Sequence, residues 1–342
     1  MKAIYFEKPN SIEVKERPIP EISDGEALVR VKYIGICGTD VHVFQGHHAT
    51  AIYPLIPGHE FVGEVAAVKG EDAVNFKLGD KVAAQEIIAC GHCDACAKGE
   101  PNACEKLRII GVHTDGGFAE YVRVKTNRMY KLPDDSNLLV ASLIEPLAVA
   151  VHDIHMSGLK AGQTALIIGG GPIGLLIAMV ARYAGARKVV ISEVIASRRK
   201  FAEELGFITV DPLEDGTDAR LNELSEGHGF DVSFEAAGVP SAITTCVDNT
   251  RNTGTIVQIA ITKGAYPVDL GKVFAKELRI QGVRIHSQYA FAVATRMAVE
   301  GSLGKGFEKL ISKVFTIDEA KEAFDYAITN KDAFKVIIKV AD

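Results

Sequence analysis

The sequence predicts an α/β protein with two domains, one rich in short β-strands and one built as a doubly wound parallel sheet. A chain of 342 residues is longer than one hydrophobic core usually holds. Up to about residue 150, Gly and Pro interrupt short alternating segments, as in antiparallel sheets. From about residue 160, apolar strands alternate with helical patterns, as in parallel βαβ units.

The first part of the chain is expected to form antiparallel strands. The clearest candidates are residues 26–36, 61–68, 79–84 and 116–124, where apolar residues alternate with polar ones or run between turn residues.

The second part is expected to form the parallel sheet. Its candidate strands are residues 164–170, 188–193, 208–212, 230–238, 254–261 and 278–283, and helical patterns cover 173–185 and 197–206. A helix over 318–330 followed by a strand over 334–340 departs from the alternation. We therefore expect the last segment to return to the first domain.

Charge and composition exclude several classes of protein. The net charge is -6 and the sequence has no basic block, so nucleic acid is not an expected partner. The N-terminal segment carries charges every few residues and lacks the apolar run of a secretory signal, so we expect a cytoplasmic protein. Residues 164–185 are nearly apolar, but glycines and a proline interrupt them, which favours a strand, a turn and a helix over a membrane span.

Gly169, Gly171 and Gly174 form a G-x-G-x-x-G motif directly after a predicted strand and directly before a predicted helix. This context suits a tight turn whose helix N-terminus, with Pro172 and Ile173, binds the pyrophosphate of a dinucleotide. The alternative is a glycine-rich structural turn.

Glu193 ends the second strand of this domain, where a carboxylate accepts the hydroxyls of an adenosine ribose and repels a 2′-phosphate. NAD is therefore favoured over NADP. Arg198, Arg199 and Lys200 follow and would tolerate a phosphate, although a solvated helix face also explains such a run. We include Arg198 among the cofactor-binding candidates.

Cys90, Cys93, Cys96 and Cys104 have the spacing C-x2-C-x2-C-x7-C. In a reducing compartment, clustered thiolates indicate a metal site, and four of them close a tetrahedron around zinc. An iron–sulfur cluster, or His92 in place of one thiolate, is the alternative. A closed tetrahedron leaves no position for a substrate, so this site would be structural.

A second set of metal ligands is spread along the chain. Cys37 lies close to Thr39, Asp40 and His42, and downstream stand His59, Glu60 and Glu145. Mixed sulfur, nitrogen and oxygen donors with one open position are what catalytic zinc requires. Each residue taken alone would more often be structural.

The motifs CGTDxH, GHExxG, DGGFAEY, EPLAVA and GGGPIG, together with the four-cysteine lobe, resemble the zinc-dependent medium-chain dehydrogenase/reductases in order and approximate spacing. The resemblance covers essentially the whole chain. Glu145 followed by Pro146 is similar to the sorbitol, butanediol and threonine dehydrogenase branch. The compact segment from Gly35 to Glu60 is similar to the L-galactonate and L-gulonate 5-dehydrogenases.

The resemblance implies a GroES-like catalytic domain over 1–150 with a structural zinc lobe at 86–106, a Rossmann NAD-binding domain over 151–285, and a segment 286–342 that returns to the catalytic domain. It also implies an active site in the cleft, two zinc ions per chain and a homotetramer or homodimer. Carried over by position, Cys37, His59 and either Glu60 or Glu145 ligate catalytic zinc, and Cys90, Cys93, Cys96 and Cys104 ligate structural zinc.

The resemblance therefore implies an enzyme that transfers a hydride between NAD and a secondary alcohol of a polyol or sugar acid. By resemblance, Thr39 and His42 pass the released proton to solvent, although His42 could instead pack behind the metal. Arg284 follows the last strand of the second domain and would suit a substrate carboxylate, or would pair with a carboxylate across a subunit contact. A non-catalytic dinucleotide-binding protein is the alternative, but it would have lost the ligands that this sequence retains.

Overall fold

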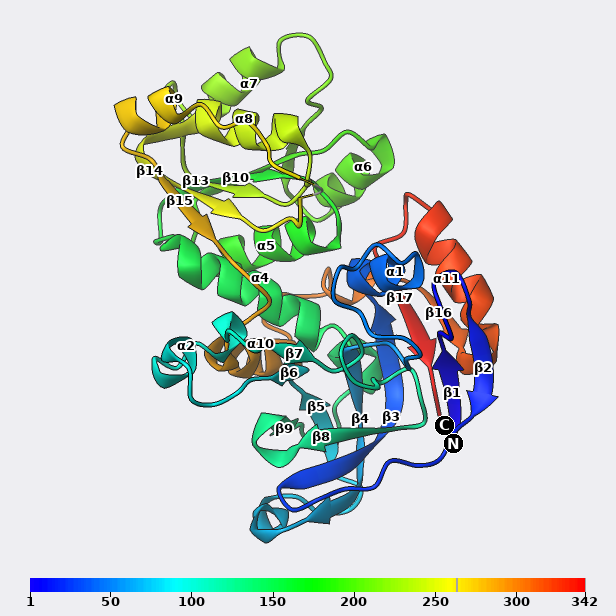
Figure 1. Ribbon diagram of the computed structural model, residues 1–342. Helices are drawn as coiled ribbons and strands as arrows, with labels where there is room; N and C mark the ends of the chain where they lie inside the picture. Colours follow the sequence, from blue (N-terminus) through cyan, green and yellow to red (C-terminus); the bar gives the residue numbers. More distant parts are fainter. Residues whose placement is uncertain (263, 342) are drawn as a thin grey trace. The chain divides into compact units, whose positions relative to one another are not determined.

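The structure is a computed structural model that describes residues 1–262 and 264–341, and at residues 72 and 73 it describes the backbone alone. The chain divides into two compact units, Met1–Glu145 with Ser287–Asp342, and Pro146–His286 (Figure 1). The first is rich in β-strands and the second has a parallel sheet flanked by helices, so the predicted α/β class is confirmed. Among the described residues, no helix is long and apolar enough to cross a membrane.

A seven-stranded sheet forms the centre of the first unit, in the order β16-β17-β3-β4-β5-β9, with β8 paired to β3. Its strands are β3 (Glu26–Ile36), β4 (Glu60–Lys69), β5 (Lys81–Ala84), β8 (Tyr121–Lys125), β9 (Met129–Lys131), β16 (Ile311–Thr316) and β17 (Lys335–Lys339). β17 inserts between β16 and β3, and Val336 lies opposite Ile36 in the antiparallel β17/β3 ladder. The last segment of the chain thus completes a sheet begun by the first.

Shorter elements surround this sheet. The strands are β1 (Lys2–Tyr5), β2 (Glu13–Glu16), β6 (Ile87–Ile88) and β7 (Arg108–Ile109), and the helices are α1 (Gly38–Phe44), α2 (Asp94–Ala97), α3 (Leu138–Ala141), α10 (Gln288–Val299) and α11 (Ala320–Thr329). In the core, the ring of Phe324 on α11 lies 5.4 Å from that of Phe6 and 5.7 Å from that of Phe118. Aromatic packing therefore also ties the last helix to the N-terminal part of the unit.

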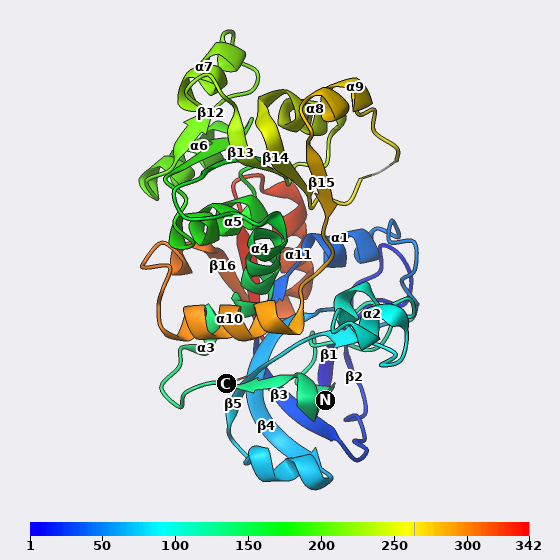
Figure 2. The same ribbon diagram turned by 90° about the vertical axis from the view of Figure 1, so that its left-hand side faces the viewer.

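The second unit is built on a parallel sheet in the order β12-β11-β10-β13-β14-β15 (Figure 2). The strands are β10 (Thr164–Ile168), β11 (Lys188–Ser192), β12 (Ile208–Val210), β13 (Phe230–Glu235), β14 (Thr250–Gln258) and β15 (Arg279–Gly282). The helices are α4 (Ile144–Ser157), which begins at the boundary of the units, α5 (Pro172–Tyr183), α6 (Ala196–Glu204), α7 (Thr217–Leu224), α8 (Pro240–Asn249) and α9 (Leu270–Ala275). Figure 1 shows α8 and α5 on opposite faces of β10 and β13, as in a doubly wound fold.

The predicted strand 116–124 forms only in its second half. Residues 116–120 belong to a loop, and β8 begins at Tyr121. The backbone N–H groups of Gly116 and Gly117 donate to the carbonyl oxygens of Ile56 and Gly58 at 2.7 and 2.9 Å. A Cβ atom at Gly116 would lie 2.3 Å from the Gly58 oxygen, so the two backbones approach too closely for any other residue. This loop supports the turn that leads into His59.

Candidate metal centre and cofactor loop

Cys37, His59 and Glu60 meet at one end of the sheet of the first unit. Cys37 follows directly on β3, His59 directly precedes β4, and Gly35 lies opposite Glu60 in the β3/β4 ladder. The register of two neighbouring strands therefore brings these distant residues together. One ligand atom from each lies within 4.8 Å of the others. A thiolate, an imidazole and a carboxylate are zinc ligands, and three of them leave a fourth position open.

Asp40 fixes two of these groups from α1. Its Oδ2 accepts the backbone N–H of Cys37 at 2.8 Å, and its Oδ1 lies 3.5 Å from Nδ1 of His59. Both side chains are buried, and neither Asp40 Oδ1 nor His59 Nδ1 has a hydrogen bond of good geometry within the described chain. Because Nδ1 faces Asp40, Nε2 is the ring nitrogen available to a metal, in the arrangement by which a carboxylate orients a ligating histidine.

The charges around His59 fit a cation at this position. Burial lowers the pKa of His59, but the negative charge of Asp40, and after it that of Cys37, outweighs burial and holds the pKa well above its usual value. Positive charge is therefore favoured at this position, and a metal ion bound at Nε2 would supply it. The donor set and the buried unpaired atoms fit zinc.

Glu60 has a cationic partner that the sequence motifs do not include. Lys335, the first residue of β17, donates a short hydrogen bond from Nζ to Oε2 of Glu60 and another to the carbonyl oxygen of Ile36 at 3.2 Å. Burial lowers the pKa of Lys335, but the charge of Glu60, and after it that of Cys37, raises the pKa above its usual value. Lys335 is therefore a buried ammonium beside the candidate metal ligands.

Glu145, the other carboxylate predicted for the metal, lies outside this group of three. It is buried in the first turn of α4, and a carboxylate oxygen of Glu145 lies within 4.8 Å of one from buried Glu86. Its charge still acts on Lys335, which places it in the surroundings of the centre.

Thr39 and His42 lie three residues apart on α1, in the turn that follows Cys37. Residues at this spacing share one helix face. Both side chains are half-buried.

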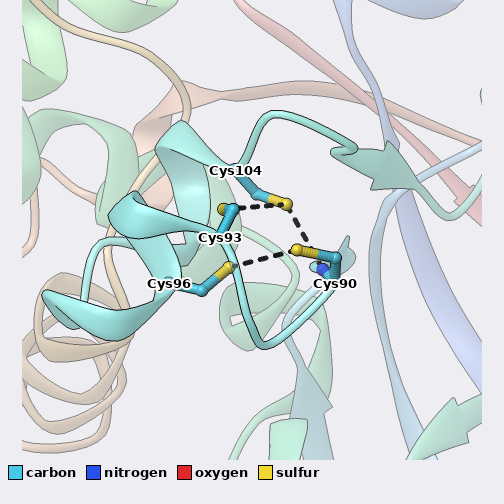
Figure 3. Close-up of side chains that lie close together, drawn as sticks. All are labelled: Cys90, Cys93, Cys96 and Cys104. Atoms are coloured by element: carbon cyan, nitrogen blue, oxygen red, sulfur yellow. Dashed lines mark hydrogen bonds between the residues drawn. The ribbon is translucent and has the colours of Figure 1, made fainter.

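The four clustered cysteines converge in the lobe that carries α2 (Figure 3). Their sulfur atoms lie within 4.8 Å of one another, with Cys90 4.0 Å from Cys96 and Cys93 3.9 Å from Cys104. Zinc–sulfur bonds of about 2.3 Å in a regular tetrahedron place sulfurs about 3.8 Å apart. The lobe is thus spaced for zinc, and every cysteine in it is a free thiol.

Backbone N–H groups favour the thiolate form in this lobe. Cys104 Sγ accepts the N–H groups of Cys90 and Lys106, each at 3.3 Å. The N–H groups of Cys96 and Glu105 lower the pKa of the Cys93 thiol to about 6. The exposed ring of His92 bonds to the Cys90 carbonyl oxygen and is not one of the four converging groups. Four thiolates around one ion would leave no open position for chemistry.

The glycine motif forms the turn between β10 and α5. Gly169 has φ of +104°, Gly171 is the N-cap of α5, and Pro172 and Ile173 open the helix. A Cβ atom at Gly174 would lie 1.9 Å from the carbonyl oxygen of Gly169, so the helix packs directly on the turn. This geometry exposes the helix N-terminus to an anion, as in dinucleotide-binding turns.

Glu193 stands directly after β11 and contacts the same turn. Its Oε2 accepts the Gly170 N–H at 2.7 Å and its Oε1 accepts the Ile195 N–H at 2.8 Å. Arg199 differs from the expected solvated helix face, because its guanidinium binds Asp211 at 2.8 Å and the Glu193 carbonyl oxygen at 2.8 Å. Arg198 reaches toward the turn, with Nη1 3.6 Å from where a Cβ at Gly171 would stand.

Arg284 lies two residues beyond β15 and is exposed. Its position places a cationic side chain after the last strand of the second unit, as the sequence predicted.

Family models match both units. The alcohol dehydrogenase GroES-like domain matches residues 23–134, and the zinc-binding dehydrogenase domain matches residues 172–300. The chain therefore belongs to the zinc-dependent medium-chain dehydrogenase/reductases, as its motifs predicted. It is an enzyme of the zinc-containing alcohol dehydrogenase class that uses a nicotinamide cofactor.

Several relatives match over nearly the full chain. A 2-dehydro-3-deoxy-L-galactonate 5-dehydrogenase of Pseudoalteromonas atlantica is 37% identical over 92% of each chain. An L-threonine 3-dehydrogenase of Shewanella pealeana is 35% identical over 99% of each chain.

Two solved structures illustrate the cofactor. An alcohol dehydrogenase from E. coli CFT073 in complex with NADH is 32% identical with a TM-score of 0.92, covering 99% of each chain. A zinc-binding dehydrogenase from Sinorhizobium meliloti 1021 bound to NADP is 33% identical with a TM-score of 0.92, covering 99% of this chain and 98% of that one.

Sequence reasoning missed Lys335 and Glu86 and gave Asp40 no role. Asp40 carried a local signal, because an acidic residue three positions after an N-cap residue forms a capping box. Lys335 and Glu86 had no such signal, since each depends on contacts between distant segments.

Proposed function

We propose that the chain is an NAD-dependent zinc dehydrogenase that oxidises a secondary alcohol of a sugar acid or polyol, in the manner of the L-galactonate and L-gulonate 5-dehydrogenases. The observation that carries the proposal is the convergence of Cys37, His59 and Glu60 with one coordination position to spare. Two zinc ions are bound per chain, one by these residues and one by Cys90, Cys93, Cys96 and Cys104, and the chain forms a homotetramer or homodimer.

When bound, the zinc ion polarises the substrate hydroxyl as a Lewis acid and the nicotinamide accepts the hydride. Cys37, His59 and Glu60 hold the metal position. Asp40 keeps the His59 ring oriented through Nδ1 and fixes the backbone of Cys37, so both ligands are set before substrate arrives. Glu145 is the alternative carboxylate ligand to Glu60 for the catalytic zinc.

Thr39 and His42 carry the hydroxyl proton toward solvent. Oxidation of an alcohol releases a proton together with the hydride, and a buried site needs a path for it. The two residues share a face of α1 and are half-buried. We therefore expect His42→Gln to slow turnover below neutral pH more than above it, because hydroxide can replace the relay at high pH.

The carboxylate of Glu193 selects NAD over NADP. It lies at the turn between β10 and α5, held by the Gly170 N–H, where a 2′-phosphate would meet a negative charge. The neighbouring Arg199 is bound to Asp211 and does not offset that charge. Glu193→Ser should reduce the ratio of NAD to NADP efficiency by at least about tenfold, since tenfold corresponds to only about 1.4 kcal/mol.

A sugar acid is preferred to a neutral polyol because Arg284 pairs with the substrate carboxylate. The relative that acts on a galactonate derivative supports this class. The L-threonine 3-dehydrogenase relative supports a second candidate, since threonine also carries a secondary alcohol near a carboxylate.

The decisive test is a panel of sugar acids, matching polyols and L-threonine, assayed with NAD and with NADP. Cys37→Ala should remove one of two zinc equivalents and nearly all turnover. Cys246→Ala is the matched control, because this thiol is buried in α8 among apolar residues. Full turnover by the Cys37 variant would refute the metal centre.

The substrate assignment has its own test. Arg284→Ala should raise the KM for sugar acids at least about tenfold and leave polyols unaffected, as expected for a lost charge-assisted contact. Arg279→Ala, in the exposed part of β15, controls for a general loss of positive charge. An unchanged preference for sugar acids would remove Arg284 from the substrate site.

A further inference from the structure

Lys335 and Glu60 form an ion pair inside the first unit, with 3% and 2% of their surfaces exposed. The two residues come from the strands on either side of β3: β17 begins with Lys335, β4 begins with Glu60, and β3 carries Gly35 and Ile36 between them. A lysine and a glutamate are seldom buried this deeply unless they are paired, because burial penalises both charges.

The backbone is shaped around the same carboxylate. A Cβ atom at Gly35 would stand 2.1 Å from Oε2 of Glu60. The carboxylate therefore occupies the space that a side chain at position 35 would fill. Two features position Glu60. The ammonium group of Lys335 binds its carboxylate, and the missing side chain at Gly35 leaves the space that the carboxylate occupies.

The oxygen held in this way has one lone pair engaged by Lys335, which weakens it as a metal ligand. Lys335 engages Oε2, and the carbonyl oxygen of Ile36 takes a second proton of the same ammonium group. One oxygen of Glu60 remains to join Cys37 and His59. A fixed cation next to the position of a divalent ion also opposes the binding of that ion through Coulomb repulsion.

We propose that Lys335, together with the gap at Gly35, restrains Glu60 to a single, weakened contact with the catalytic metal, so that the metal keeps a position open for substrate. The inference rests on the proposed metal centre of Cys37, His59 and Glu60. Lys335 is a positioning residue, because it acts through Glu60 and touches neither substrate nor metal.

The test compares metal binding in the full-length wild type, Lys335→Met, Lys335→Arg and Gly35→Ala. The probes are Zn²⁺, followed by its release to a chromogenic chelator, and Co²⁺, followed by the visible absorption bands of the substituted catalytic site. Cys37→Ala assigns the signals to a site: the phase of zinc release and the cobalt absorption bands that this variant loses are those of the catalytic centre. Neither readout requires turnover.

Lys335→Met should bind Zn²⁺ at least about tenfold more tightly and change the cobalt bands, because the carboxylate released from Lys335 can turn both oxygens to the metal and the repulsion by the ammonium group is lost. Lys335→Arg should keep wild-type behaviour. In a Glu60→Gln background, Lys335→Met should leave the cobalt bands unchanged and should tighten Zn²⁺ binding by less than it does in wild type, because only the Coulomb repulsion is removed there. Unchanged or weaker Zn²⁺ binding by Lys335→Met would overturn the proposal.

Gly35→Ala tests the same restraint on Glu60 with Lys335 still present. It replaces Lys335→Met in the experiment if that variant does not fold. Its methyl group should displace Oε2 and tighten Zn²⁺ binding in the same direction. Gly38→Ala is the matched control, because a Cβ there meets nothing within 4 Å. If wild type shows no catalytic cobalt bands, the proposed function fails; if the bands are present and both variants match wild type, this inference alone fails.

Discussion

The glycines of the turn between β10 and α5 have two different roles. Gly174 allows the helix to pack on the turn, and Gly171 allows the cofactor to approach it. In Gly174→Ala the new Cβ would stand 1.9 Å from the carbonyl oxygen and 3.0 Å from the carbonyl carbon of Gly169. Both are backbone atoms, so the turn itself must move. In Gly171→Ala the new Cβ would meet only Nη1 of Arg198, at an ordinary contact distance of 3.6 Å.

The magnitudes follow from these contacts. Forcing an extra methyl group into a packed site costs roughly 1–3 kcal/mol. Removing a helical glycine returns about 0.5–1 kcal/mol, so Gly174→Ala should lose about 1–2 kcal/mol. For a unit of this size that loss lowers the unfolding midpoint by roughly 2–8 °C. Gly171→Ala should leave the midpoint unchanged or slightly raised.

Two assays distinguish the roles. Thermal unfolding without cofactor reports on packing, and NADH fluorescence titration reports on the approach of the pyrophosphate to the turn. Both variants should lose NADH affinity, whereas Gly174→Ala alone should lose stability. Equal stability of Gly174→Ala and wild type would refute the packing argument, and wild-type NADH affinity in Gly171→Ala would refute the approach of the phosphate.

Two further outcomes are expected. Asp153 on α4 is fully buried, and its carboxylate oxygens accept no hydrogen bond from the described residues. Burial raises the pKa of Asp153 well above its usual value, and the charge of His286 opposes this rise only in part. The folded state therefore binds this proton more tightly than the unfolded state, and stability falls as pH rises from about 4 through the raised pKa. Asp153→Asn should remove part of that fall, with a gain of about 1–3 kcal/mol at neutral pH and little change near pH 4, measured by urea unfolding; an undiminished pH dependence would contradict it. Cys104→Ser should release one zinc ion, lower the unfolding midpoint and expose residues 86–106 to protease, while the catalytic cobalt bands persist; loss of those bands would show that the two centres depend on each other.

Much of the fold was readable because local signals agreed with the global architecture. The strand 164–168, the glycine turn and the following helix were predicted from residues adjacent in sequence, and the structure has them as β10, the turn and α5. The four clustered cysteines were readable for the same reason, since C-x2-C steps bring sulfurs together without help from distant segments.

The remaining features depend on strand register and on contacts between distant segments. Lys335 reaches Glu60 only because β17 inserts beside β3, a pairing between residues 275 positions apart. The loop at 116–120 has the alternation of a strand, but Gly116 passes close to Gly58 and the segment pairs with β1 only through an isolated bridge between Ala119 and Ala3. Arg199 stands in a run of charges typical of a solvated helix face, but it is instead bound to Asp211, which follows β12. No periodicity in the sequence encodes these partners.

The insertion of β17 between β16 and β3 sets an order for assembly during synthesis. The cysteine lobe draws all four thiols from one short segment, so the zinc ion proposed for it could bind soon after that segment leaves the ribosome. The Cys37 centre has its ligands early, but the ammonium group that faces Glu60 is translated about 275 residues later. Until then the carboxylate lacks its counter-ion, so a nascent chain would hold metal at this centre differently from the finished enzyme.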